Sequence, residues 1–62
     1  MRMTMRQARL YYGLSQSKIA RELGIHPKTY ARLEDRADII TVAQYRRFCE
    51  ILGVKRDEIF LP

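Results

Sequence analysis

The sequence predicts an all-α fold, and three observations lead to that prediction. Apolar residues recur three and four positions apart, as they do on one face of a helix. The three glycines, Gly13, Gly24 and Gly53, each follow an amphipathic stretch, as a glycine at a helix C-cap does. No segment alternates between apolar and polar residues over a useful length. Since 62 residues allow one small domain, we expect a compact five-helix bundle over residues 1–62, with residues 1–3 as a flexible arm.

The start of each helix is marked by a residue that favours the first turn. Capping-box pairs, in which a threonine precedes a glutamine by three residues, predict helix starts at Thr4–Gln7 and Thr41–Gln44. Ser15 can cap the second helix. Pro27, directly after His26, stands in the first turn of the third helix, where its missing N–H costs no hydrogen bond. The expected helices are 4–12, 16–23, 27–34, 42–52 and a short one near 56–60.

The fourth helix shows the apolar spacing most clearly. Its apolar residues form a single stripe, which consists of Val42, Tyr45, Phe48, Cys49 and Leu52. Because Cys49 lies in that stripe, we interpret it as a small buried residue. One cysteine excludes an intramolecular disulfide, and one cysteine with one histidine cannot form a structural zinc site, so we expect no metal and no cofactor. A chain without disulfides fits a reducing, cytoplasmic compartment.

Positive charge is concentrated in the first part of the chain. Residues 1–34 carry seven Lys or Arg against two Asp or Glu, whereas residues 35–62 carry five of each, so the net charge of +5 lies entirely before residue 35. A one-sided basic surface favours a polyanionic partner, while charge that only keeps the protein in solution is an equally open explanation. No apolar run is long enough to span a bilayer, and the start of the chain lacks the apolar region of a signal peptide.

Residues 16–33 combine a helix, a short turn and a second helix, in the run QSKIARELGIHPKTYARL. Small Ala20 lets the two helices approach closely, and Gly24 makes the turn between them. Five apolar residues are placed to fill the wedge between the helices: Ile19, Leu23, Ile25, Tyr30 and Leu33. The pattern predicts a helix-turn-helix, an arrangement whose second helix lies in the major groove of DNA.

The chain resembles the Cro and phage-repressor (XRE) helix-turn-helix family in the run LSQSKIARELGIHPKTYARLE, which is followed by EILGVKRDEIF. The resemblance covers roughly residues 5–60. It implies a five-helix bundle of the lambda-repressor type and a sequence-specific transcriptional regulator that binds double-stranded DNA, often as a dimer. It also implies a structural pair between Arg9 in the first helix and Glu34 at the end of the recognition helix.

The resemblance further implies which residues contact DNA. The positions that read bases in the family correspond here to Pro27, Lys28 and Arg32. Arginine and lysine can donate to guanine O6 and N7, and the proline ring can meet a thymine methyl group. The residues expected on the DNA backbone are Gln16, His26, Thr29 and Arg36. Arg36 stands where the family usually has a glycine, in a loop over residues 35–40 that contains acids where many relatives are basic.

A second function is also open, namely a protein-interaction module of the same fold, such as an antitoxin or accessory subunit. Its contact surface would consist of Tyr11, Tyr12, Ile39 and Ile40. We expect a weak homodimer, because apolar residues exceed what the helices need and twofold dimers are the commonest oligomers. An enzyme ranks last, since no nucleophile–base pair, metal-ligand cluster or glycine-rich phosphate loop occurs, and we expect no small-molecule substrate and no membrane partner. The small size suggests a regulator, for example a repressor, in a phage, mobile-element, toxin–antitoxin or restriction-control setting.

Overall fold

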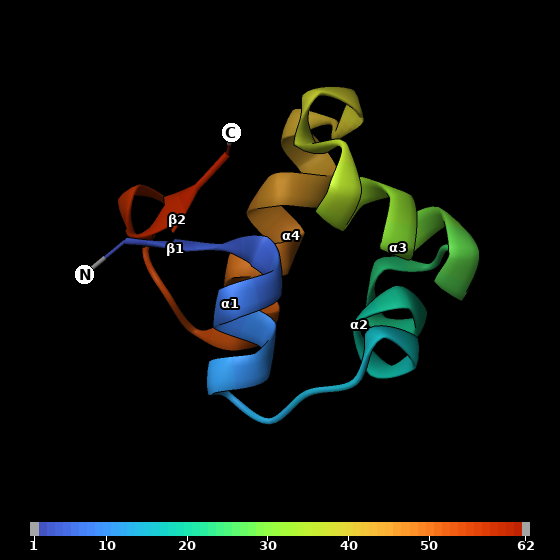
Figure 1. Cartoon of the computed structure of the whole chain (residues 1–62), viewed down its shortest axis with the longest axis horizontal. Helices are drawn as coiled ribbons and strands as arrows, with labels where there is room; N and C mark the ends of the chain where they lie inside the picture. The colour runs from blue at the N-terminus through green and yellow to red at the C-terminus, as the bar shows by residue number, and fades with distance from the viewer. Residues whose placement is uncertain (1, 62) are drawn as a thin grey trace.

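The computed structural model describes residues 2–61, which form four α-helices, two 3-10 helices and two strands. In chain order these are β1 (Met3–Thr4), α1 (Met5–Tyr11), α2 (Gln16–Leu23), α3 (Pro27–Asp35), η1 (Ala37–Ile39), α4 (Val42–Leu52), η2 (Arg56–Glu58) and β2 (Ile59–Phe60). Figure 1 shows α4 between α1 and α3, with the two strands on the far side of α1. α2 packs against both α3 and α4, and so joins α3 to the rest of the domain.

Side chains cap all four α-helices at the positions expected from the sequence. At the start of α1, Thr4 Oγ1 accepts a hydrogen bond from the N–H of Gln7 at 3.1 Å, and Gln7 Oε1 accepts one from the N–H of Thr4 at 2.9 Å. The box at the start of α4 has both bonds at 3.0 Å. Ser15 Oγ accepts from the N–H of Lys18 at 3.0 Å. The predicted bounds of α2 and α4 agree with the structure, and those of α1 and α3 differ by at most one residue at an end.

The predicted all-α class is confirmed, but the number of five helices is wrong. In place of the helix predicted at 56–60, the chain forms the 3-10 turn η2 and then strand β2, which pairs in parallel with β1. Isoleucine and phenylalanine both favour extended backbone, and a partner strand is available. The Tyr45 hydroxyl also donates to the carbonyl of Arg56 and lies 3.2 Å from that of Ile59. Helical hydrogen bonds are thus replaced by bonds to a side chain and to a strand.

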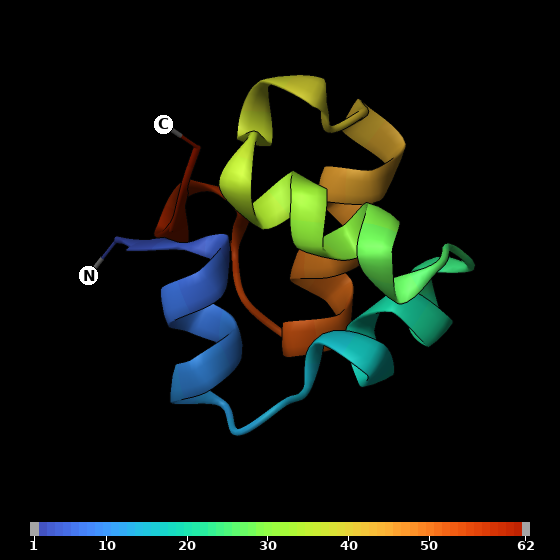
Figure 2. The ribbon, with the colours of Figure 1, turned by 45° about the vertical axis from the view of Figure 1, so that its right-hand side comes forward.

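Residues 2–4 lie against the rest of the domain, and the flexible arm expected at residues 1–3 stays a prediction. Met3 lies in β1 opposite Ile59, and the guanidinium of Arg2 lies over the ring of Phe60, 5.4 Å from its centroid. Met1 is outside the described residues. The two strands lie side by side at one end of the molecule in both views (Figures 1 and 2). The pairing therefore brings the early and late parts of the chain together.

The core is centred on Tyr30 of α3 and Phe48 of α4. Both side chains are fully buried, and their rings stack with centroids 6.4 Å apart. Cys49 belongs to the same buried cluster, as predicted. The other members of the cluster are Met5, Ala8, Ile19, Ala20, Leu33, Leu52 and Ile59. The core thus draws on every α-helix and on β2, and it locks α3 in place.

Val42, which belongs to the predicted apolar stripe, and Phe60 both lie outside the core. Val42 is 69% exposed, because it occupies the first turn of α4, outside the part of the apolar stripe that faces the core. Phe60 is 44% exposed, because successive side chains of a strand point to opposite sides and Ile59 takes the inward position. Both side chains therefore add to the exposed apolar surface.

Candidate nucleic-acid interface

The segment from α2 to α3 forms a tight helical pair. Gly24 caps α2 with a φ of 73°, a left-handed conformation that glycine adopts at no steric cost. The N–H of Ile25 then donates to the carbonyl of Ala20 at 3.0 Å, which closes the turn. Ile19 and Ala20 have no exposed surface. Figure 2 shows the two helices packed at an angle to each other around the turn that joins them.

α3 buries one face and exposes the other. Tyr30 and Leu33 point into the core, whereas Lys28, Thr29 and Arg32 are exposed. Lys28 and Arg32 are four residues apart, so their side chains lie on the same side of the helix, one turn apart. The ion pairs found in residues 2–61 involve neither of these two cations. The exposed face of α3 therefore presents two positive charges that no carboxylate of the described chain neutralises.

His26 holds the N-terminus of α3. Its Nδ1 accepts a hydrogen bond from the N–H of Lys28 at 3.0 Å, and Pro27 occupies the first helical position. Because Nδ1 is the acceptor, the proton of the neutral imidazole lies on Nε2. His26 thus caps α3 through Nδ1, and an N–H donor is left on its exposed side chain.

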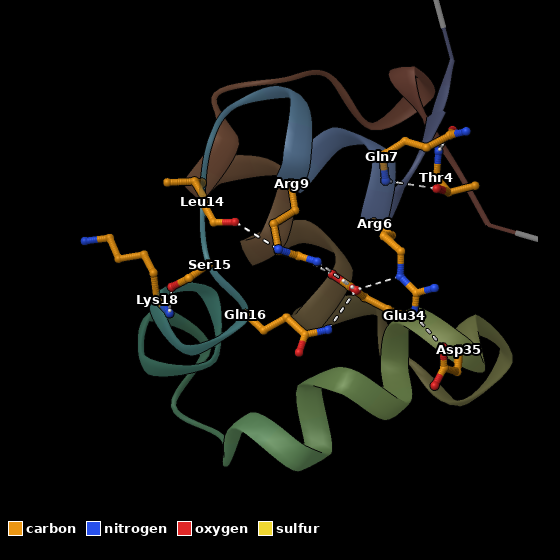
Figure 3. Close-up of polar contacts among 10 residues, drawn as sticks. All are labelled: Thr4, Arg6, Gln7, Arg9, Leu14, Ser15, Gln16, Lys18, Glu34 and Asp35. Atoms are coloured by element: carbon orange, nitrogen blue, oxygen red, sulfur yellow. Dashed lines mark hydrogen bonds and ion pairs between the residues drawn. The ribbon is translucent and has the colours of Figure 1, made fainter.

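Glu34, near the other end of α3, accepts hydrogen bonds from three side chains (Figure 3). Arg9 Nε donates to Oε2 at 2.6 Å, while Arg6 Nε and Gln16 Nε2 donate to Oε1 at 3.2 and 3.0 Å. The Glu34 side chain has no exposed surface. Arg9 also donates from a terminal nitrogen to the carbonyl of Leu14 at 3.0 Å. One carboxylate therefore connects α1, α2 and α3, and it brings together the predicted pair Arg9 and Glu34.

Comparison with known proteins agrees with this geometry. A family model described as a helix-turn-helix domain matches residues 1–59. The chain belongs to the helix-turn-helix domain family. No curated protein and no solved structure is significantly similar to it. The description of that family does not specify the Cro and phage-repressor family, so that narrower placement stays a prediction.

Burial and hydrogen bonding act in opposite directions on the Glu34 carboxyl of this helix-turn-helix domain. Burial raises its pKa, but hydrogen bonds from Arg9 and from the other donors outweigh burial, and the net pKa lies below the ordinary value. Glu34 is therefore charged at neutral pH. The Tyr30 hydroxyl is buried without a hydrogen-bond partner among residues 2–61. Loss of solvation, and next the neighbouring Glu34 carboxylate, raise the pKa of Tyr30 far above its usual range.

The four residues predicted to contact the DNA backbone lie in different settings. His26 and Thr29 are exposed in the first turn of α3. Gln16 is half-buried, and its amide nitrogen is hydrogen-bonded to Glu34. Arg36, just after α3, is exposed and forms an ion pair with Asp38 at 3.2 Å. The internal bond of Gln16 was not predicted, because it depends on how α2 and α3 pack.

Sequence reasoning missed Arg6. Its Nε contacts Glu34, and its terminal nitrogen donates to Asp35 Oδ1 at 2.5 Å. The available signal is spacing, since Arg6 and Arg9 are three residues apart and therefore lie on one face of α1. The two adjacent carboxylates at the end of α3 match that pair of arginines.

Exposed carboxylates in this domain are mostly paired with arginines. Asp35 pairs with Arg6, Asp38 with Arg36, and Glu50 with Arg47.

Within residues 2–61, no group of three or more His, Cys, Asp or Glu side chains is arranged to hold a metal ion. In the same part of the chain, no helix has the length and apolar character needed to cross a membrane.

Proposed function

We propose that this domain is a sequence-specific transcriptional regulator that binds double-stranded DNA with α3 in the major groove. The division of α3 into two faces carries the proposal. Tyr30 and Leu33 fix the helix in the core, while Lys28 and Arg32 are exposed and unpaired in the described chain. The major groove admits an α-helix, and the second helix of a helix-turn-helix lies there. We place this regulator in the cytoplasm, because a chain with a single cysteine needs no oxidising compartment to fold.

Base reading is assigned to Pro27, Lys28 and Arg32. Arginine can form two parallel hydrogen bonds with guanine O6 and N7, and lysine reaches the same acceptors. The exposed Pro27 ring offers an apolar contact for a thymine methyl group. Each well-formed contact to a base provides about 1–3 kcal/mol of discrimination against the wrong base.

Backbone contacts are assigned to Gln16, His26, Thr29 and Arg36. The Nε2–H of His26 and the Thr29 hydroxyl are donors in the exposed first turn of α3, where the helix dipole also favours phosphate. Gln16 uses one amide N–H on Glu34 and keeps a second for phosphate. Such contacts set the register of the protein on DNA without reading sequence.

We further propose a weak homodimer on a palindromic operator. Two α3 helices related by a twofold axis would occupy half-sites about 34 Å apart. The support is exposed apolar surface beyond what the core uses, contributed by Tyr11, Tyr12, Ile39, Val42 and Phe60. An inverted repeat in the preferred DNA site is the signature of this arrangement.

Selection from a pool of random duplexes at about 0.15 M salt tests the proposed function. We expect enrichment of a defined site that forms an inverted repeat. The double variant Lys28→Gln/Arg32→Gln should lose the preference for that site. A matched double variant of exposed α4 residues, Arg46→Gln/Arg47→Gln, removes the same charge and should keep it. A pool that stays random after repeated rounds contradicts the proposal.

The alternative function, a protein-interaction module, is favoured by one observation. Tyr11 and Tyr12 at the end of α1 are 67% and 45% exposed, and their rings pack edge to face with centroids 5.0 Å apart. Exposed aromatic clusters are common at protein interfaces. The same selection separates the two functions. For a DNA-binding regulator, Tyr11→Ala keeps the preferred half-site, because α3 reads it, whereas for an interaction module the wild-type protein enriches no site.

A further inference from the structure

One arginine spans two neighbouring carboxylates at the end of α3. Arg6 Nε donates to Glu34 Oε1 at 3.2 Å, and its terminal nitrogen donates to Asp35 Oδ1 at 2.5 Å (Figure 3). The Glu34 side chain has no exposed surface, whereas that of Asp35 is 65% exposed. Arg6 therefore reaches from α1 across to the last two residues of α3, from the buried side to the exposed side.

Two attachment points restrict a helix more than one does. Consecutive residues point about 100° apart around a helix axis, so Glu34 and Asp35 leave α3 in different directions. Burial of Tyr30 and Leu33 sets the general orientation of α3. Of the two carboxylates at its end, Arg9 contacts only Glu34. Arg6 adds the second direction and so restricts rotation of the last turn. That rotation governs where Arg32, at the start of the same turn, points.

Arg6 also neutralises Asp35. Without this partner, an exposed carboxylate would stand unpaired at the end of the helix assigned to DNA. Like charges repel across a few ångströms of solvent, so phosphates and Asp35 would oppose each other. Arg6 therefore favours DNA binding in two ways, because it restricts the last turn of α3 and neutralises the charge of Asp35.

We propose that Arg6 is a positioning residue for DNA recognition. It orients α3 through Glu34 and Asp35 and does not contact DNA itself. The inference rests on the proposed DNA-binding function, and it concerns a residue outside the assigned base and phosphate contacts. It predicts that loss of Arg6 weakens binding to the preferred site through a change in α3.

The variants that test this proposal are Arg6→Gln, Asp35→Asn and the two combined. Arg47→Gln is the matched control, because Arg47 is 48% exposed, close to the 51% of Arg6, and also contacts two carboxylates, Glu22 and Glu50. Asp35→Asn removes only the charge of the outer partner and leaves the contact with Glu34 in place, so it keeps the test informative if Arg6→Gln folds poorly. Unfolding curves establish the temperature at which every variant is folded.

Dissociation constants for the selected duplex and for a scrambled duplex, over a range of salt, provide the first measurement. We expect Arg6→Gln to lose about fivefold in affinity for the selected duplex relative to Arg47→Gln. The salt slope, which is the slope of the logarithm of the binding constant against the logarithm of the salt concentration, should keep its magnitude. In the Asp35→Asn background the loss should be smaller, since the two residues act together. Equal losses for Arg6→Gln and Arg47→Gln overturn the proposal. A drop of about 0.9 in the salt slope also overturns it, because that marks a direct phosphate contact.

Hydrogen exchange without DNA provides the second measurement. The N–H of Arg36 donates to the carbonyl of Arg32 at 2.7 Å and reports on the last turn of α3. Its exchange should accelerate in Arg6→Gln and not in Arg47→Gln, and unchanged exchange overturns the inference while leaving the proposed function standing. Conversely, wild-type protein that binds both duplexes equally overturns the proposed function and the recognition role of Arg6 together.

Discussion

Arg9 Nε lies 2.6 Å from Glu34 Oε2, and this contact joins α1 to the end of α3 across 25 positions of sequence. The carboxylate is fully buried and the arginine nearly so. A buried ion pair adds little net stability when intact, but removal of one partner leaves the other charge buried and unpaired. Arg9 and Glu34 therefore make the position of α3 depend on α1.

Replacement of Arg9 should destabilise the domain strongly. Arg9→Met keeps an apolar stem but removes the donor, and we expect the free energy of unfolding to fall by about 3 kcal/mol. This is the low end for a broken buried pair, because Arg6 and Gln16 still donate to Glu34. Urea unfolding measures the change. The control Arg46→Met alters an exposed residue and should shift stability by less than about 0.5 kcal/mol. Similar small shifts for both variants would contradict the structural role of Arg9.

Stability should fall in acid because of Glu34. Its folded pKa lies below the unfolded value of about 4.3, so the unfolded chain takes up the proton more readily. The contribution of Glu34 is therefore fully present above about pH 4.3 and is lost as the pH falls through the folded pKa. Urea midpoints measured over this interval should decrease in the wild type and decrease less steeply in Glu34→Gln. If the urea midpoints of the wild type and of Glu34→Gln fall equally with pH, the acid sensitivity comes from other carboxylates.

Removal of the Tyr30 hydroxyl should stabilise the domain. The hydroxyl is buried and has no hydrogen-bond partner in residues 2–61, so Tyr30→Phe deletes an unsatisfied polar group while keeping the ring. We expect a gain of about 1 kcal/mol in the free energy of unfolding. Tyr45→Phe is the control, because the Tyr45 hydroxyl is hydrogen-bonded to backbone carbonyls and its loss should be destabilising. A destabilised Tyr30→Phe would mean that the hydroxyl donates to Glu34.

Local signals allowed the helices to be predicted from the sequence. The caps at Thr4, Ser15, His26 and Thr41 act over two or three residues, and all four are present in the structure. The conformation of residues 56–60 could not be predicted in the same way. Their conformation depends on pairing with Met3–Thr4 at the other end of the chain, and a two-residue strand is too short to show a period of two.

The candidate site also combines features that local sequence signals predict with features that depend on long-range packing. The exposure of Lys28 and Arg32 follows from helical periodicity once Tyr30 and Leu33 are placed in the core. The convergence of Arg6 and Gln16 on Glu34 requires the packing of three helices, which no local pattern specifies. Long-range side-chain bonds around a buried charge are therefore what the structure adds.

Gln16 should contribute to affinity without contributing to sequence preference. In Gln16→Ala, a neutral donor to phosphate is lost, and we expect about tenfold weaker binding to selected and scrambled duplexes alike. The lost bond to Glu34 should also lower stability by about 1 kcal/mol. Ser17→Ala, at the exposed neighbouring position, is the control for both measurements. Lower stability with unchanged affinity would limit Gln16 to its internal bond.

Base reading by the exposed face of α3 is tested most directly with a base-by-base specificity profile of the selected site. Competition binding with every single-base-pair variant, for the wild type and for Arg32→Ala, gives the preference at each position. We expect Arg32→Ala to lose about 1–3 kcal/mol of discrimination at one base pair of each half-site and to keep the preference elsewhere. A profile that keeps its shape at every base pair when Arg32 is removed would contradict base reading by this residue and favour a contact to phosphate alone.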